Sequence, residues 1–199
     1  MINSVLKLLH HAVTLLFGVY ISAAFLGIRM SRKNIAVLCG FSAAVGVVST
    51  LSFIFFGEAF TAQVYPLIIH LPLILFLTLY YKYTALRSTL SVLTAYLCCQ
   101  ISKWAGLAML SITENEWVYY SVRIVTTIVV FAILIRYVSN AAAQLIQKPK
   151  EALLIFAILP FTYYFFDYAT GVYTELIYSG KKVVSEFLGF ALSIAYLLF

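Results

Sequence analysis

Ionisable side chains inside long apolar stretches are the residues of this chain best suited to chemistry. They are His70, Lys103, Arg123, Asp167 and Glu186. Charged groups inside a membrane are energetically costly, and they normally face the interior of a helix bundle or a water-filled cavity. There the cations would bind an anionic group, and the carboxylates would bind a cationic or hydrogen-bonding group. The residue types therefore predict a ligand-binding site.

These ionisable positions fall at a similar depth along their helices. At 1.5 Å per residue, Lys103 and Asp167 each lie about 22 Å from the inner ends of their stretches. Arg123 lies about 8 Å below the outer end of its own stretch. His70 and Glu186 lie slightly higher. Five apolar stretches thus bring polar groups to one layer in the outer third of the bilayer.

Helical spacing adds aromatic and amide side chains to the same faces, because residues three or four apart share one face of a helix. The predicted site is an outward-open pocket lined by His70, Gln100, Lys103, Trp104, Arg123, Tyr163, Tyr164, Asp167 and Glu186. A structural role is the alternative. In that case the cations extend to the outer head groups, or one of them pairs with Asp167 only to hold helices together.

The stretches that carry these residues have the length of membrane-spanning helices. A spanning helix needs about 20 mostly apolar residues, and the chain is 64% hydrophobic and 10% charged, with a mean hydropathy of +1.02. This composition excludes a soluble domain. It predicts one all-α domain over residues 1–199, a polytopic bundle of seven transmembrane helices near 8–28, 35–56, 66–81, 88–110, 118–138, 152–169 and 183–199.

The joints between these stretches alternate in charge, and this alternation predicts the orientation. Lys and Arg are concentrated in cytoplasmic joints of membrane proteins, which places 29–34, 82–87 and 139–151 inside. The joints 57–65, 111–117 and 170–182 are then outside, with the N-terminus outside and the C-terminus inside. The net charge of +6 comes mostly from the inner joints, so it indicates contact with anionic membrane lipid and not with nucleic acid.

Small residues and prolines predict two local features of the bundle. Small residues recur four apart in the first two stretches, as in Gly18-Ser22 and Ser42-Gly46, and such spacing lets helices approach closely in lipid. The first two helices are therefore expected to form a tight hairpin. Pro72 removes one intrahelical hydrogen bond and is expected to kink the third helix.

Catalytic and cofactor motifs are missing from the sequence. It has no HExxH, no GxSxG, no glycine-rich phosphate loop and no pair of carboxylates within one stretch. Hydrolysis, phosphoryl transfer and metal chemistry therefore have no support within these 199 residues. We expect no catalytic residues, no metal site and no cofactor.

Three segments carry a resemblance to a known family: residues 65–72 (YPLIIHLP), 93–101 (LTAYLCCQI) and 166–174 (FDYATGVYT). They resemble the membrane region of Firmicutes sensor histidine kinases that have a GHKL-type ATP-binding domain. The resemblance implies the sensor half of a homodimeric kinase in a bacterial plasma membrane. The phospho-acceptor region and the nucleotide-binding boxes are absent from this sequence. The last apolar stretch has no basic anchor after it, which leads us to expect a cytoplasmic portion beyond Phe199.

The leading hypothesis is a signal-sensing membrane domain of a two-component system, which binds an extracellular or membrane ligand in the outer pocket. A small solute-binding subunit of a membrane transporter is the main alternative, because its length and outward pocket would be similar. An integral-membrane enzyme is a third and weaker alternative, since no catalytic constellation is present.

Overall fold

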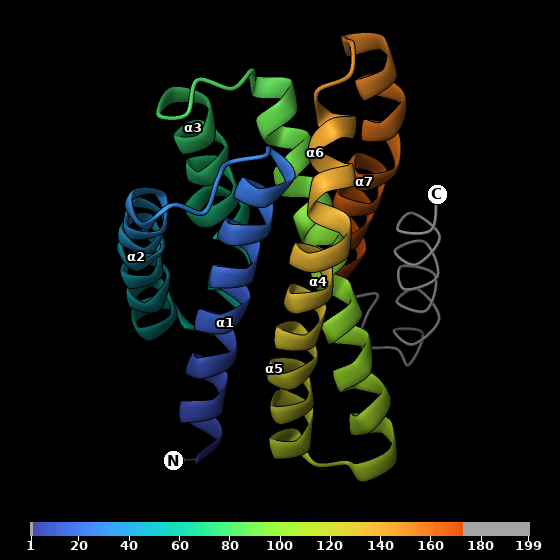
Figure 1. Ribbon diagram of the computed structural model, residues 1–199. Coiled ribbons are helices and arrows are strands. Elements are labelled where there is room, and N and C mark those ends of the chain that lie inside the picture. Colours follow the sequence, from blue (N-terminus) through green and yellow to red (C-terminus); the bar gives the residue numbers. More distant parts are fainter. Residues whose placement is uncertain (1, 173–199) are drawn as a thin grey trace.

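The computed structural model describes residues 2–172, and 90% of these residues are helical with no strand among them. The elements form one bundle (Figure 1). In chain order they are α1 (Ile2–Phe25), α2 (Arg32–Tyr65), the π-helical turn η1 (Pro66–His70), α3 (Leu71–Leu79), α4 (Ala85–Thr113), α5 (Glu116–Ile133), the π-helical turn η2 (Leu134–Val138), α6 (Ser139–Ile146) and α7 (Lys150–Gly171).

The predicted all-helical class is confirmed for the described residues, but the predicted count of seven spans is not. Five helical stretches are long and apolar enough to cross a membrane: Val5–Phe25, Arg32–Gly57, Ala59–Leu79, Glu116–Ile146 and Lys150–Ala169. A chain with this many candidate spans is a multi-pass membrane protein. The seventh predicted stretch, 183–199, lies outside the described residues.

Helix α4 is the most enclosed helix of the bundle, and it is more polar than the five apolar stretches. It packs against α5, α1, α7 and α3. Two of its buried serines have partners on neighbouring helices. Ser91 donates a 2.6 Å hydrogen bond to the carbonyl of Ser22, and Ser88 accepts a 3.0 Å bond from Thr78. The protein around α4 thus offers these two serines partners that lipid could not offer.

Two of the predicted joints are instead mostly helical. Residues 57–65 were expected to be an outer connection, but the backbone changes direction at Gly57 and is helical again through Tyr65. Gly57 has φ 85° and ψ 176°, a conformation that only glycine adopts without strain. At the other end, residues 139–146 form α6, which continues α5 through η2. The expected inner joint 139–151 is therefore reduced to 147–149.

The third span contains a π-helical turn where a kink was predicted. The amide of Leu71 donates to the carbonyl of Pro66, five residues earlier. Pro72 follows directly and has no amide hydrogen to donate. The disruption therefore takes the form of a wider helical turn, at whose end His70 is buried.

The predicted hairpin of α1 and α2 is only partly correct. A side chain at Gly46 would come within 3.3 Å of Leu15 on α1, so the helices approach closely there. Gly18 and Gly40, in contrast, have no neighbouring atom within 4 Å of an added Cβ. Helix α1 packs more extensively against α5 and α4 than against α2.

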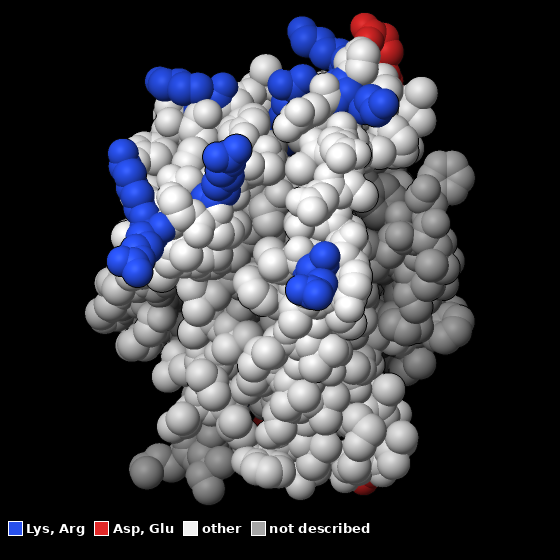
Figure 2. All heavy atoms as spheres, in the orientation of Figure 1, with Lys and Arg blue, Asp and Glu red and all other residues white. Residues whose placement is uncertain are grey.

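Basic residues gather at one end of the bundle (Figure 2). The α1–α2, α3–α4 and α6–α7 connections meet at this end, as Figure 1 shows, and they or the adjoining helix turns carry Arg29, Arg32, Lys33, Lys82, Arg87, Lys148 and Lys150. The opposite end holds the start of α1 and the α4–α5 connection. Glu114 and Glu116 lie at that connection.

Replacement of Gly57 by alanine is expected to destabilise the protein by about 1–3 kcal/mol, because a Cβ strains a backbone of this conformation. Gly40→Ala is the matched control on the same helix. It lies in regular helix with open space around it, so it should be neutral or stabilising by up to about 1 kcal/mol. Thermal unfolding of both variants in detergent measures the difference. Equal melting temperatures for Gly57→Ala and the parent would contradict the glycine requirement.

Candidate ligand-binding cavity

Two adjoining cavities of about 220 and 320 Å³ lie between the helices. Both are lined by side chains from α1, α2, α4 and α5. The residues common to both are His10, His11, Tyr65, Tyr96, Lys103 and Arg123. The polar layer expected from the sequence therefore surrounds hollow space within the bundle.

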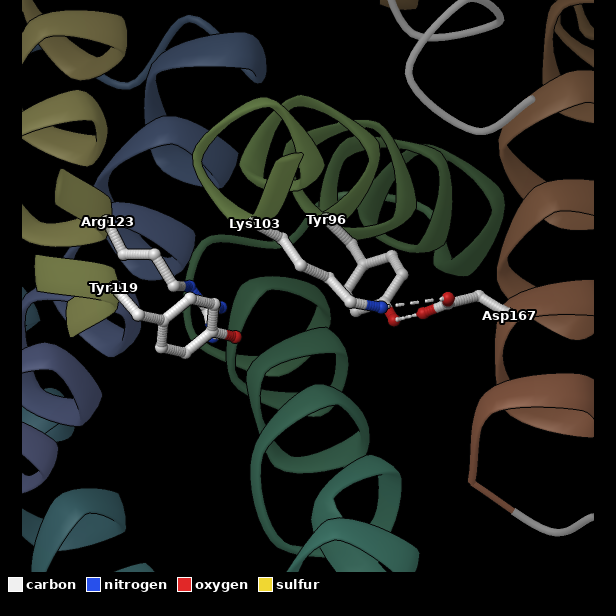
Figure 3. Close-up of polar contacts among 5 residues, drawn as sticks. All are labelled: Tyr96, Lys103, Tyr119, Arg123 and Asp167. Atoms are coloured by element: carbon white, nitrogen blue, oxygen red, sulfur yellow. Dashed lines mark hydrogen bonds and ion pairs between the residues drawn. The ribbon is translucent and has the colours of Figure 1, made fainter. Parts of the chain in front are cut away.

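Asp167 joins α7 to α4 at the edge of the larger cavity. Its carboxylate lies 3.3 Å from the Lys103 ammonium and accepts a second hydrogen bond from the Tyr96 phenol (Figure 3). The side chains of Lys103 and Asp167 are only 25% and 12% exposed. The cation and the phenol offset part of the cost of burying this carboxylate. The predicted pairing of Asp167 with a cation is confirmed for Lys103.

Arg123 does not pair with Asp167. From the sequence alone, either Lys103 or Arg123 could have been its partner. Its guanidinium donates a 2.7 Å hydrogen bond to the Tyr119 hydroxyl and lies 5.1 Å from that ring (Figure 3). Its aliphatic stem crosses α4 at Gly106, where an added Cβ would lie 2.9 Å from the Arg123 Cδ. The absence of a side chain at Gly106 thus lets this arginine lie between α4 and α5.

Aromatic rings form the wall between the π-helical turn and α7. The Nδ1 of His70 is hydrogen-bonded to the Tyr164 hydroxyl at 2.8 Å. The rings of Tyr65, Tyr96 and Tyr164 have centroids 5.1–5.3 Å from that of His70, all in edge-on contact. Such edge-to-face packing is favourable between aromatic rings. The wall connects the third span, α4 and α7.

The histidines of α1 are lining residues that our sequence analysis did not include in the site. The buried His10 is hydrogen-bonded to Thr14 at 3.2 Å, with its ring 5.8 Å from that of Tyr120. His11 points to a different helix and is hydrogen-bonded to Ser49 of α2 at 2.9 Å. A signal was available, because Lys7, His10, Thr14 and Gly18 recur at helical spacing on one face. All but Gly18 are polar, and all four line a cavity.

The structure brings together most of the predicted site. His70, Gln100, Lys103, Arg123 and Asp167 line one or both cavities. Tyr164 reaches the site through its bond to His70. Trp104 and Tyr163 are buried but do not line either cavity, and Glu186 lies outside the described residues. Within residues 2–172 no group of His, Cys, Asp or Glu is arranged to hold a metal ion.

The electrostatic character of the lining favours an anionic ligand. Among residues 2–172, three cationic side chains, those of Lys7, Lys103 and Arg123, and one carboxylate, that of Asp167, line the two cavities, which gives a formal excess of two positive charges. The Oε1 of the buried Gln100 and the Nε of Arg123 have no hydrogen-bond partner. Buried polar atoms normally have one. Both atoms belong to residues that line the smaller cavity.

Replacement of Asp167 by asparagine should lower stability by about 1.5–3 kcal/mol, the usual worth of hydrogen bonds to a charged group. The change leaves Lys103 without its anionic partner in a partly buried position. Glu151→Gln is the matched control, since Glu151 is exposed in the first turn of the same helix. Thermal unfolding in detergent compares the two. The exchanged pair Asp167→Lys with Lys103→Asp should recover part of the loss, and a parent-like Asp167→Asn would show that the ion pair contributes nothing.

The chain was compared with known proteins at the level of family, sequence and fold. No protein-family model, no curated protein and no solved structure matches it. The resemblance to the membrane region of sensor histidine kinases therefore stays a prediction. Any function must be argued from the cavity and from the helices that enclose it.

Proposed function

We propose that this chain is a signal-sensing transmembrane domain whose ligand binds in the cationic cavity. The observation that carries the proposal is the position of the Lys103–Asp167 ion pair at the cavity edge. The pair connects α7 to α4, and α7 leads to the C-terminal part of the chain. A ligand that binds beside this pair can therefore act on the helix that follows the cavity in the sequence.

The proposed orientation places the cavity in the outer half of the membrane. The end of the bundle that carries the basic connections (Figure 2) would face the cytoplasm under the positive-inside rule. In this proposal the N-terminus is outside, α4 spans the membrane among the five apolar stretches, and residues 183–199 form a seventh span that ends inside. The cavity then receives its ligand from the outer side or from the outer leaflet.

The proposed mechanism is competition for Lys103. An anionic ligand group would approach the Lys103 ammonium and replace the Asp167 carboxylate as its partner. A ligand shifts a conformational equilibrium only through its different affinity for the two states. Here the state with α7 released from α4 no longer holds the Asp167 carboxylate beside Lys103, so the positive charge there is less compensated and this state binds the anion more tightly.

The proposed output is a cytoplasmic histidine kinase outside these 199 residues, and the proposed assembly is a homodimer in a bacterial plasma membrane. The support for both is the resemblance of residues 65–72, 93–101 and 166–174 to sensor histidine kinases.

A cavity of this kind would equally suit the capture of a solute by a transport subunit. In that case α7 has no need to move.

Single-cysteine labelling tests the orientation. With Cys39, Cys98 and Cys99 replaced by alanine, we expect cysteines at Lys33 and Lys148 to react with a membrane-impermeant maleimide only after cells are permeabilised. A cysteine at Glu114 should react in intact cells. The opposite pattern would reverse the orientation and place the cavity in the inner half of the membrane.

Pulsed electron paramagnetic resonance tests whether α7 depends on the ion pair. Spin-labelled side chains would be introduced at two exposed positions, Ile112 of α4 and Phe165 of α7. These residues are 75% and 71% exposed. Asp167→Asn should change or broaden the distance distribution between them, while Glu151→Gln should reproduce the parent distribution. An unchanged distribution in Asp167→Asn would contradict the sensor mechanism and favour the transport subunit.

A further inference from the structure

An apolar groove runs along the outer surface of α1 and α2 beside the cavity. It has a volume of about 510 Å³ and is more open than the cavities. Its lining is mostly aliphatic and small: Leu8, His11, Ala12, Leu15, Leu16, Cys39, Ser42, Ala43, Gly46, Val47, Thr50 and Leu51. Along α1 it extends from Leu8 to Leu16, about 12 Å of helix. These dimensions and this lining suit one alkyl chain.

The groove adjoins the cationic cavity, and the two share several lining residues. Leu8, His11 and Thr50 line both the groove and the larger cavity, and Leu15 lines both the groove and the smaller one. A molecule could therefore lie in the groove with one end and in the cavity with the other. A small water-soluble anion would use only the cavity.

Small side chains create the room in the groove. Ala12, Ala43 and Gly46 have no atoms beyond Cβ, while the flanking Leu16 and Val47 are exposed on the outer surface. The open side of the groove faces outward from the bundle, where a bilayer would surround α1 and α2. A chain could thus enter sideways from the membrane without the helices having to separate.

The polar end of the same space suits an oxyanion. Arg123 and Lys7 carry positive charge into the larger cavity, and the Arg123 Nε has no hydrogen-bond partner. An arginine donates readily to the oxygens of a phosphate or carboxylate. Charge at one end and an apolar groove at the other define the chemistry of the ligand.

We propose that the ligand is a single-chain anionic amphiphile, with its oxyanion head group in the cationic cavity and its alkyl chain in the α1–α2 groove. This inference rests on the proposed function, because it names the class of ligand for the same cavity. The head group would lie next to Lys103, where it competes with Asp167. The amphiphile is drawn from the outer leaflet through the open side of the groove.

Direct binding tests the proposal with three probes. The full chain is placed in phosphatidylcholine nanodiscs. The amount of radiolabelled probe that these nanodiscs retain is compared with the amount that empty nanodiscs retain. Dodecyl phosphate should bind saturably. A neutral dodecyl polyethylene glycol ether, which has the same chain, and inorganic phosphate, which resembles the head group alone, should each bind at least tenfold more weakly.

Paired variants separate the head-group and chain sites. Ala43→Phe fills the groove, and Ala44→Phe is its matched control, because Ala44 is exposed on α2 but does not line the groove. Ala43→Phe should weaken dodecyl phosphate binding at least tenfold, and Ala44→Phe should leave it unchanged. Arg123→Gln should also weaken dodecyl phosphate binding at least tenfold. If Arg123→Gln does not fold, Lys7→Gln serves as a second head-group variant.

The outcomes distinguish this inference from the proposed function. If inorganic phosphate binds as tightly as dodecyl phosphate, or if Ala43→Phe binds dodecyl phosphate like the parent, the ligand is not an amphiphile in the groove. The cavity would then still bind an anion, and the sensor proposal would stand. If neither phosphate compound binds saturably, both the amphiphile and an anionic ligand for this cavity are overturned.

Discussion

A carboxylate buried in a membrane protein must have partners, and this requirement determines how α7 is attached to the bundle. Removing an ion from water costs several kcal/mol unless opposite charge and hydrogen bonds compensate. Asp167 finds both on α4, in the Lys103 ammonium and the Tyr96 phenol. The aromatic contacts of Tyr164 and Tyr168 with His70 surround the same point. Helix α7 packs mainly against α4, so its position depends strongly on this small set of polar contacts.

The distribution of polarity among the helices follows from what surrounds each of them. The five apolar stretches present large hydrophobic side chains outward, such as Phe55 of α2 and Ile155 of α7. The enclosed α4 instead carries serines, a glutamine and a lysine that face other helices or the cavity. Helix α4 is thus less apolar than the five stretches, although it supplies Tyr96, Gln100 and Lys103 to the site. The polar character of α4 reflects its role as the common neighbour of the other helices.

The sequence was sufficient for the helical class and for much of the site, because both depend on local periodicity. The depth of Lys103 and Asp167 along their helices predicted that they could meet, and they do. Which faces meet is a tertiary property, so Arg123 could not be assigned to Tyr119 in place of Asp167. His10 and His11 were not included in the predicted site, because nothing in one sequence shows that α1 turns these side chains toward α5 and α2. Residues 139–146 were read as a joint because their hydropathy is low, although alanines such as Ala141 favour helix strongly.

The π-helical turns have a consequence for insertions and deletions in this protein. In η1 and η2 the closing amide bonds to a carbonyl five residues back, one more than in an α-helix. Each turn therefore holds one extra residue, and everything after it is rotated by about 100° relative to a continuous α-helix. Deletion of a single residue from Pro66–His70 would remove the extra residue, and the regular helix that results would keep the following face toward the site. Deletion of a single residue from the α-helical part of the third span would instead rotate that face by about 100°, a change that a hydropathy profile would hardly register.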